Sequence, residues 1–257
     1  MNEIKRLETN VDQAMHDLSS VKEAIVSSGV DVPNGTRTSE YAGKVTDVYN
    51  KGKRNGESTF LNMLSNNNNR KNYYGVFASS NLEGYTFPYT IKPGDIGRMF
   101  YVYVGKYMPG NIDFSQATES TGGYYQTFCW ADVLEEIYFN APAPTGQYLM
   151  TFAYCRKVKK IDRINVLEQT TFSQAFLQCW ALEEITIGGT IGQTVSFSDS
   201  PLNKTSIENV IGTLSSSASG KTLELKSSAV TNAFGSTDSD EWKNLIATKS
   251  NWTITLV

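Results

Sequence analysis

The stretch FCWADVLEEIYF, residues 128–139, sets a pattern that recurs twice further along the chain. Phe128, Phe152 and Phe176 stand 24 residues apart, and small or apolar residues follow each of them three, six and nine positions later. The first and third copies also have an apolar residue at the eleventh position. The recurring residues are Ala131, Leu134, Ile137 and Phe139, then Cys155, Val158 and Ile161, then Cys179, Leu182, Ile185 and Ile187.

A period in the range of roughly 20–29 residues with a Leu-x-x-Ile-x-Ile core is typical of a leucine-rich-repeat solenoid. The last three apolar positions predict one short strand whose alternating residues face inward. One such coil cannot bury its own apolar edge, so it must stack on a neighbour. In the second copy Arg163 takes the eleventh position and Ile164 follows it, which predicts a bulge or a shifted register. Upstream, a degenerate first copy with a longer connection is indicated by Met99, Phe100, Tyr103, Tyr107 and Ile112.

Composition and charge limit the class of protein. Of 257 residues, 40% are hydrophobic and 19% charged, so we expect a sizeable core and no global disorder. A formal net charge of −3 argues against a nucleic-acid partner, which needs a clustered basic face. No apolar run reaches the roughly 18 residues of a membrane span, and the N-terminus lacks the layout of a secretory signal peptide. We therefore expect synthesis in a cytoplasm and no membrane insertion.

The chain divides into five parts, and the expected fold class is α+β. Residues 1–29 predict an amphipathic helix with a heptad seam, which favours a coiled coil over a helix packed on its own domain. Residues 30–71 predict a helical linker or attachment segment, 72–99 an N-terminal cap, 100–200 the repeats, and 201–257 a β/α cap. In that cap we expect helices over 206–214 and 238–248. The heptad seam, whose β-branched residues favour a homotrimer over a dimer, consists of Ile4, Leu7, Val11, Ala14, Leu18, Val21 and Ile25.

Residues suited to catalysis or to metal binding are scarce. His16 is the only histidine, so the sequence predicts no His-based metal site, no catalytic residue and no cofactor. Three dispersed cysteines are too few for a disulfide framework or a zinc site. Cys155 and Cys179 share one repeat position, and we expect both to be buried packing thiols.

Two carboxylate pairs, Glu135-Glu136 and Glu183-Glu184, are the best candidates for glycosidase chemistry, which uses paired acids. Both pairs stand at the same repeat positions, and the middle copy has Lys159-Lys160 there. Neighbouring strands lie about 4.8 Å apart, so stacking would alternate acid, base and acid. This arrangement favours a surface ion ladder over a polysaccharide-degrading site.

A binding face is the stronger functional hypothesis. The residues between the inward positions of each strand point away from the core and share one sheet surface. Aromatic residues are dense nearby, at Tyr124, Tyr125, Trp130, Tyr148, Tyr154 and Trp180, and they suit sugars and protein partners alike. The alternative is that Trp130, Tyr154 and Trp180 pack between coils or line a subunit contact. The predicted ligand- or receptor-binding set is Glu136, Tyr138, Asn140, Lys160, Asp162, Glu184 and Thr186.

The Phe-x2-Cys-x2-Leu-x2-Ile pattern resembles BspA-type leucine-rich repeats of gut bacteria and their phages. The tail is similar to the terminal unit of that family in Ser200-Pro201-Leu202, in 221–225 and in 247–253, although Ser250-Asn251-Trp252 replaces the Gly-Trp often found there. The segments 35–45 and 48–52 resemble the N-terminal part of many prophage tail or baseplate proteins.

This resemblance implies a non-enzymatic tail protein in the virion that binds a host-surface glycan or protein and contacts other tail or baseplate proteins. A bacterial adhesin or interaction module without a virion role is the alternative.

Overall fold

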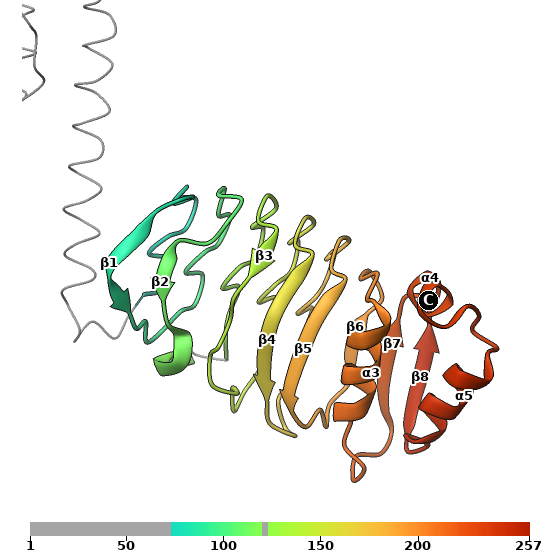
Figure 1. Ribbon diagram of the computed structural model, residues 1–257. Helices are drawn as coiled ribbons and strands as arrows, with labels where there is room; N and C mark the ends of the chain where they lie inside the picture. The colour runs from blue at the N-terminus through green and yellow to red at the C-terminus, as the bar shows by residue number, and fades with distance from the viewer. Residues whose placement is uncertain (1–72, 120–122) are drawn as a thin grey trace, which may run out of the picture. The chain divides into compact units, whose positions relative to one another are not determined.

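The structure is a computed structural model that describes residues 73–119 and 123–257, without the side chains of Pro88 and Tyr89. The predicted coiled coil of residues 1–29, the segment 30–71 and the oligomerisation residues lie outside the described part. The described chain forms a β-solenoid, in which short strands of successive coils lie side by side (Figure 1). The repeat architecture expected from the 24-residue period is thereby confirmed at the level of a stacked solenoid.

A column of phenylalanine rings runs through the centre of the solenoid. Centroids of neighbouring rings lie 4.5–5.8 Å apart, and each ring is at most 2% exposed. From Phe100 to Phe176 adjacent rings are parallel to within 9°. Phe100 therefore heads a coil, as its degenerate repeat predicted. In chain order the column consists of Phe77, Phe100, Phe128, Phe152, Phe176 and Phe197.

Within the segment 72–99, which the sequence suggested as a cap, residues 73–98 form a coil of their own. Phe77 packs on Phe100 with the ring centroids 5.4 Å apart. Strand β1 (Thr86–Ile91) pairs in parallel with β2 (Gly110–Ile112), and the short 3₁₀ helix η2 (Phe114–Gln116) follows. The periodic part of the chain therefore begins before residue 99.

Three strands of the repeats pair in parallel: β3 (Glu136–Ile137), β4 (Lys160–Val166) and β5 (Glu184–Gly189). The inward residues at their entrances, Leu134, Val158 and Leu182, are all 0% exposed. The register shifts between Ile161 and Ile164, so that Ile164 rather than Arg163 pairs with Ile187. The irregularity predicted at Arg163 is confirmed, because the bulge turns the guanidinium outward and returns an isoleucine to the core.

On the other side of each coil lies a turn around the central phenylalanine. We call the aligned turns of successive coils the turn row. In four successive coils the residues two before and two after the central phenylalanine have positive φ angles, although none of them is glycine. Such a backbone costs roughly 1–2 kcal/mol per residue outside glycine. Direct hydrogen bonds between coils offset it: the Phe128 N–H donates to Thr151 O over 2.8 Å, and the Phe152 N–H donates to Ala175 O over 3.1 Å.

Helix α3 (Lys204–Thr213) takes the place of the next strand beside β5. Its Ser206 hydroxyl accepts a hydrogen bond from the Ile185 N–H at 3.0 Å. The Asn209 side chain accepts from the Ile187 N–H at 2.7 Å and donates to the Ile187 carbonyl at 3.3 Å. Side chains of a helix thus satisfy the outer edge of β5, which would otherwise leave backbone groups unpaired.

The chain ends in a second parallel sheet, ordered β6 (Val195–Phe197), β7 (Lys221–Leu225) and β8 (Trp252–Leu256). Helix α5 (Asp240–Ala247) and α3 match the two helices expected here, whereas α4 (Ser227–Phe234) was not expected. Within the described part of the chain, no helix has the length and apolar character required to cross a membrane.

Candidate binding surface on the strand face

The outward side chains of β3, β4 and β5 form one surface, which we call the strand face. Tyr138 is 56% exposed, and Glu136, Asp162, Glu184 and Thr186 are also exposed. Lys160 is half-buried and lies beside Glu136 and Glu184 in the strand register. The structure thus brings six of the seven predicted binding residues onto this surface with accessible side chains.

Asn140 is the member of the predicted set that has a structural partner. Its side-chain oxygen accepts from the Phe114 N–H at 2.8 Å, and its amide donates to an Asp113 carboxylate oxygen at 2.8 Å. The Ser115 N–H and then the Asn140 amide lower the pKa of Asp113, because both donate to its charged form. Asn140 therefore fixes η2 against the coil that follows β3.

Three shallow hollows lie along the strand face, with volumes of about 290, 490 and 450 Å³. The hollow of about 290 Å³ lies between the other two, and we call it the middle hollow. It shares Met108 and Tyr138 with the second, and Lys160 and Asp162 with the third. The shared residues show that the hollows are neighbours in a row across successive coils, and we call this row the groove. Asn209 lines its far end, where α3 stands beside β5.

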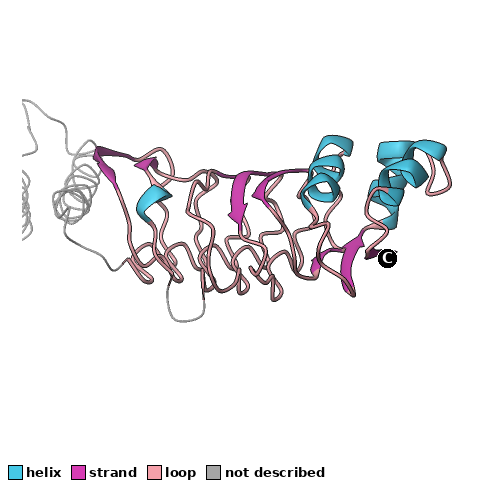
Figure 2. Cartoon of the chain, turned by 90° about the horizontal axis from the view of Figure 1, so that it is seen from below, coloured by secondary structure: helices cyan, strands magenta, loops and turns pink. Residues whose placement is uncertain are grey.

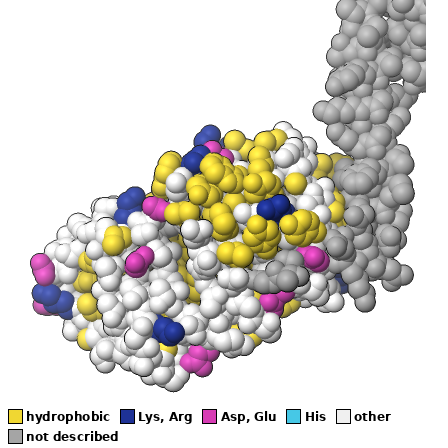
Figure 3. Space-filling model, turned by 180° about the vertical axis from the view of Figure 1, so that it is seen from behind, with side chains coloured by type: hydrophobic (Ala, Val, Ile, Leu, Met, Phe, Trp, Pro, Cys, Tyr) yellow, Lys and Arg dark blue, Asp and Glu magenta, His cyan; other side chains and the backbone are white. Residues whose placement is uncertain are grey.

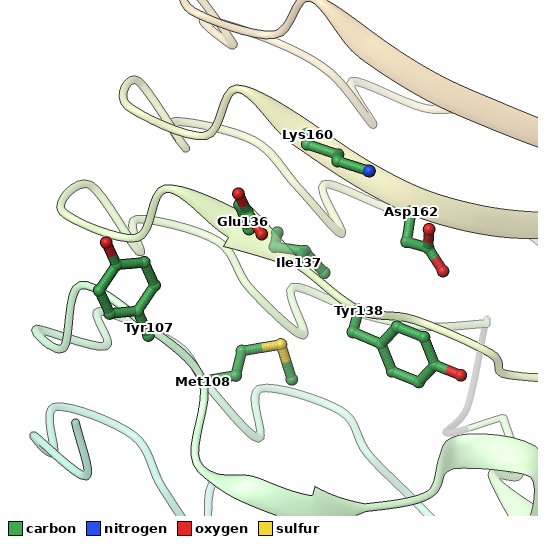
Figure 4. A pocket seen from close by; sticks show the side chains of 7 residues that line it. All are labelled: Tyr107, Met108, Glu136, Ile137, Tyr138, Lys160 and Asp162. Atoms are coloured by element: carbon green, nitrogen blue, oxygen red, sulfur yellow. The ribbon is translucent and has the colours of Figure 1, made fainter. Parts of the chain in front are cut away.

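Figure 4 shows the middle hollow, with Tyr107 and Tyr138 at two sides of Met108. Glu136 comes from β3, while Lys160 and Asp162 come from β4 (Figure 4). Tyr107 is 45% exposed and was assigned in the sequence to a degenerate repeat, not to the binding set.

The alignment of neighbouring coils by their hydrogen bonds explains why Tyr107 lies beside the predicted binding residues. The Glu135 N–H donates to Lys106 O, and the Lys159 N–H donates to Glu135 O, so Lys106 is level with both. The next residue, Tyr107, is therefore level with Glu136 and Lys160. Counting from Phe100 misses this alignment by a single residue, because the connection in that coil is one residue shorter before the strand.

An ion ladder runs along the entrance to the strands. Glu135 lies 3.2 Å from the Lys106 ammonium and 4.0 Å from that of Lys159, and Lys160 lies 3.6 Å from Glu184. The alternation of acid and base predicted from the sequence is present in these pairs. The pairs are largely exposed and each contributes about 0–1 kcal/mol, so they align coils more than they stabilise them.

The turn row carries a second surface, the turn face, in which aromatic rings enclose arginines. Trp130 and Tyr154 stack with centroids 4.1 Å apart, and the Arg156 guanidinium lies 5.0 Å from the Trp130 ring and 5.1 Å from the Trp180 ring. Arg98 lies 5.2 and 5.0 Å from two further rings, those of Tyr101 and Tyr125.

The aromatic residues that the sequence analysis placed near the strand face therefore lie elsewhere, some in the core and the others on the turn row. Tyr124 and Tyr148 are buried, at 1% and 0% exposed. The others belong to the turn row, and strands β1 to β5 run along the opposite side of the coils (Figure 2). Seen from behind the strands, hydrophobic side chains gather into a patch (Figure 3). Packing between coils, the alternative considered from the sequence, describes the stacked pair Trp130 and Tyr154.

The cysteines lie inside the solenoid. The Cys155 thiol donates to Phe128 O at 3.0 Å and the Cys179 thiol donates to Phe152 O at 3.1 Å, so each joins neighbouring coils. Burial raises the pKa of both thiols and that of Cys129, the last to about 11. The assignment of Cys155 and Cys179 as buried packing thiols is confirmed, and Cys129 is buried as well. In residues 73–119 and 123–257, no group of three or more His, Cys, Asp or Glu residues could hold a metal ion.

Comparisons with known proteins found no match. No protein-family model matches the chain, and neither a curated protein nor a solved structure matches it. A function is therefore inferred from the geometry of the two faces and from the sequence motifs.

Proposed function

We propose that this chain is a receptor-binding component of a phage or prophage tail, and that its strand face holds a host-surface glycan or protein. The observation that carries the proposal is the groove, the row of neighbouring hollows along β3, β4 and β5 that is lined by aromatic, acidic and basic side chains. In this proposal the solenoid is of the BspA leucine-rich-repeat type, as the Phe-x2-Cys-x2-Leu-x2-Ile pattern implies.

The groove has the properties of a prepared binding surface. Its side chains project from strands whose backbones are paired, so little conformational freedom is lost when a ligand binds. Coils about 4.8 Å apart repeat the outward positions at a regular spacing, which suits an extended polymer. No residue of the buried phenylalanine column lines the groove.

Oligomerisation through residues 1–29 completes the proposal, although these residues lie outside the described part of the chain. Several weak sites on one homotrimer raise the overall affinity by orders of magnitude without new contacts, provided that they can bind simultaneously. The measurement is the oligomeric mass of the intact chain and of a chain that starts at Val30. A monomer in both cases would remove the coiled coil and weaken the tail assignment.

The strand face is tested by replacing Tyr138, Asp162 and Thr186 together with alanine and measuring adsorption of particles to host cells. We expect adsorption to fall at least about tenfold, because multivalent binding multiplies the loss at each site. A control with Lys157→Ala and Glu183→Ala changes two exposed residues that do not line the groove. Normal adsorption of the triple variant would exclude this face as the receptor surface.

A second candidate, a protein-interaction module or adhesin without a virion role, is favoured by the turn face. Trp180 is 52% exposed and Trp130 is 38% exposed, and aromatic residues with arginine are enriched at protein interfaces. Electron microscopy of induced lysates separates the two candidates, since only the first predicts the chain in a particle.

A further inference from the structure

Two carboxylates in the middle hollow of the strand face make no ion pair with any residue that the structure describes. We infer that this hollow selects glycans whose sugars carry a free, protonated amine. The inference rests on the proposed function, since it names the ligand class of the same groove. Glu136 and Asp162 both line the hollow, and among the described residues neither accepts a hydrogen bond or pairs with a cation.

The cations nearest to the hollow are already engaged. Lys160, the one cationic residue that lines it, lies 3.6 Å from Glu184. Lys106, next to Tyr107 in the chain, lies 3.2 Å from Glu135. With Glu136 and Asp162 against Lys160, the lining has a net negative charge, which attracts ammonium groups and opposes carboxylates or phosphates.

The apolar part of the hollow fits the ring of a sugar. Tyr107 and Tyr138, 45% and 56% exposed, stand at two sides, and Met108 and Ile137 lie between them (Figure 4). The face of a tyrosine ring contacts the C–H groups of a pyranose and also attracts a cation placed over it. The Lys106 ammonium already lies 5.2 Å from the centroid of the Tyr107 ring, so the Tyr138 ring is the one that can take the cation of a ligand. An amino sugar offers an apolar ring face and an ammonium group in one unit, so it matches both features of the hollow.

A glycan fits this groove better than a peptide does. Peptides that bind sheets commonly add a strand to a free edge and use main-chain hydrogen bonds. Here β4 is paired on both sides, and Ser206 and Asn209 of α3 satisfy the outer edge of β5. Recognition over β4 and β5 therefore depends on side chains, and the three neighbouring hollows offer contacts to several successive sugars.

The experiment measures binding of the full-length protein to three oligosaccharides of equal length by isothermal titration calorimetry. The probes are chitosan oligomers with free amines, their fully N-acetylated counterparts and oligogalacturonate. We expect the free-amine oligomer to bind at least about tenfold more tightly than the acetylated one, and oligogalacturonate to bind most weakly. Raising the salt concentration should weaken only the free-amine complex, because exposed charge pairs are screened.

The variant Glu136→Gln with Asp162→Asn keeps the shape of the hollow and removes its charge. We expect its affinity for the free-amine oligomer to fall about tenfold, to that of the acetylated oligomer, whose binding should not change. The matched control, Glu183→Gln with Asp238→Asn, removes two carboxylates that do not line the groove. It should bind as the unmodified protein does.

The outcomes separate this inference from the proposed function. Equal binding of acetylated and free-amine oligomers, preference for oligogalacturonate, or an unchanged affinity in the Glu136→Gln, Asp162→Asn variant would overturn the selectivity. A lysine-rich peptide that binds as tightly as the free-amine oligomer would overturn the assignment to glycans. In each case the adsorption assay with Tyr138, Asp162 and Thr186 replaced still decides whether the strand face is the receptor surface.

Discussion

The two sides of the solenoid follow different rules. On the turn row, backbone torsions repeat from coil to coil and adjacent rings from Phe100 to Phe176 are parallel to within 9°. On the strand side, strands vary from two to seven residues between β3 and β4, and the register shifts at Arg163. The turn row therefore sets the coil repeat, and the strand side can vary in sequence without altering it.

The chemistry of the two faces differs in the same way. On the turn face, Arg156 is enclosed by rings and lies 3.4 Å from Asp132, so its polar groups have partners within the protein. On the strand face, Glu136 and Asp162 have none among the described residues. Polar groups that have partners contribute to the fold, whereas groups without partners are available to a ligand.

The largest effect is expected from Phe152→Ala in the phenylalanine column. The Phe152 ring is 0% exposed and lies between Phe128 and Phe176, at 5.8 and 5.6 Å. Removing it leaves a cavity between two coils and should lower the free energy of unfolding by about 3–5 kcal/mol. Urea unfolding measures the change.

The control for that experiment is Trp180→Ala on the turn face. Trp180 is larger than Phe152 but 52% exposed, so its removal should cost less than about 1 kcal/mol. A loss at Trp180 equal to that at Phe152 would show that the column does not set the coil repeat.

Much of the column could be predicted from the sequence, because its residues are large, apolar and evenly spaced. Phe128, Phe152 and Phe176 reveal the period, and Ile164 after Arg163 reveals the shifted register. Burial requires an apolar residue at each of these repeat positions, and such a residue at a regular spacing can be recognised in the sequence. The coil around Phe77 was missed, since its neighbours differ from the repeat pattern.

The candidate site could be predicted only in part, because side-chain partners leave no period. The strand positions of Tyr138 and Asp162 follow from alternation, and both are exposed as expected. The role of Asn140 depends on Asp113 and Phe114, which lie in a connection of irregular length. Likewise, no spacing rule places Trp130 and Trp180 on the opposite side of the coil from the strands.

A smaller effect is expected at the edge of β5, where α3 takes the place of a strand. Asn209→Ala leaves the Ile187 N–H without its partner, which should cost about 1–3 kcal/mol. Urea unfolding and hydrogen exchange at the Ile187 amide measure the change. Glu208→Gln, at an exposed position of the same helix, should stay within about 0.5 kcal/mol. Unchanged exchange at Ile187 after Asn209→Ala would show that the side chain does not close this edge.

The turn face should respond to a change that keeps its charge. Arg156→Lys retains the positive charge but loses the planar guanidinium that lies against Trp130 and Trp180. We expect a loss of about 0.5–1 kcal/mol, together with a shift in tryptophan fluorescence. Lys160→Arg on the strand face is the matched exchange and should leave stability within about 0.5 kcal/mol. Equal changes in stability for Arg156→Lys and Lys160→Arg would contradict the proposed chemical difference between the two faces.

The smallest effect is expected at Asp113, a half-buried carboxylate that contributes to the fold. Its pKa is lowered in the folded chain by the Ser115 N–H and then by the Asn140 amide. An unfolded aspartate titrates near about pH 4, so the contribution is present above that pH and is lost as pH falls through the folded pKa. Asp113→Asn should therefore lower stability slightly at neutral pH and flatten its decline below about pH 4, as urea midpoints would record. Asn140→Ala removes one of these two donors, so it should flatten the decline in the same direction and by less. A decline that Asp113→Asn leaves unchanged would show that this carboxylate does not stabilise the fold, and the distinction between carboxylates that hold the coils and carboxylates available to a ligand would be lost.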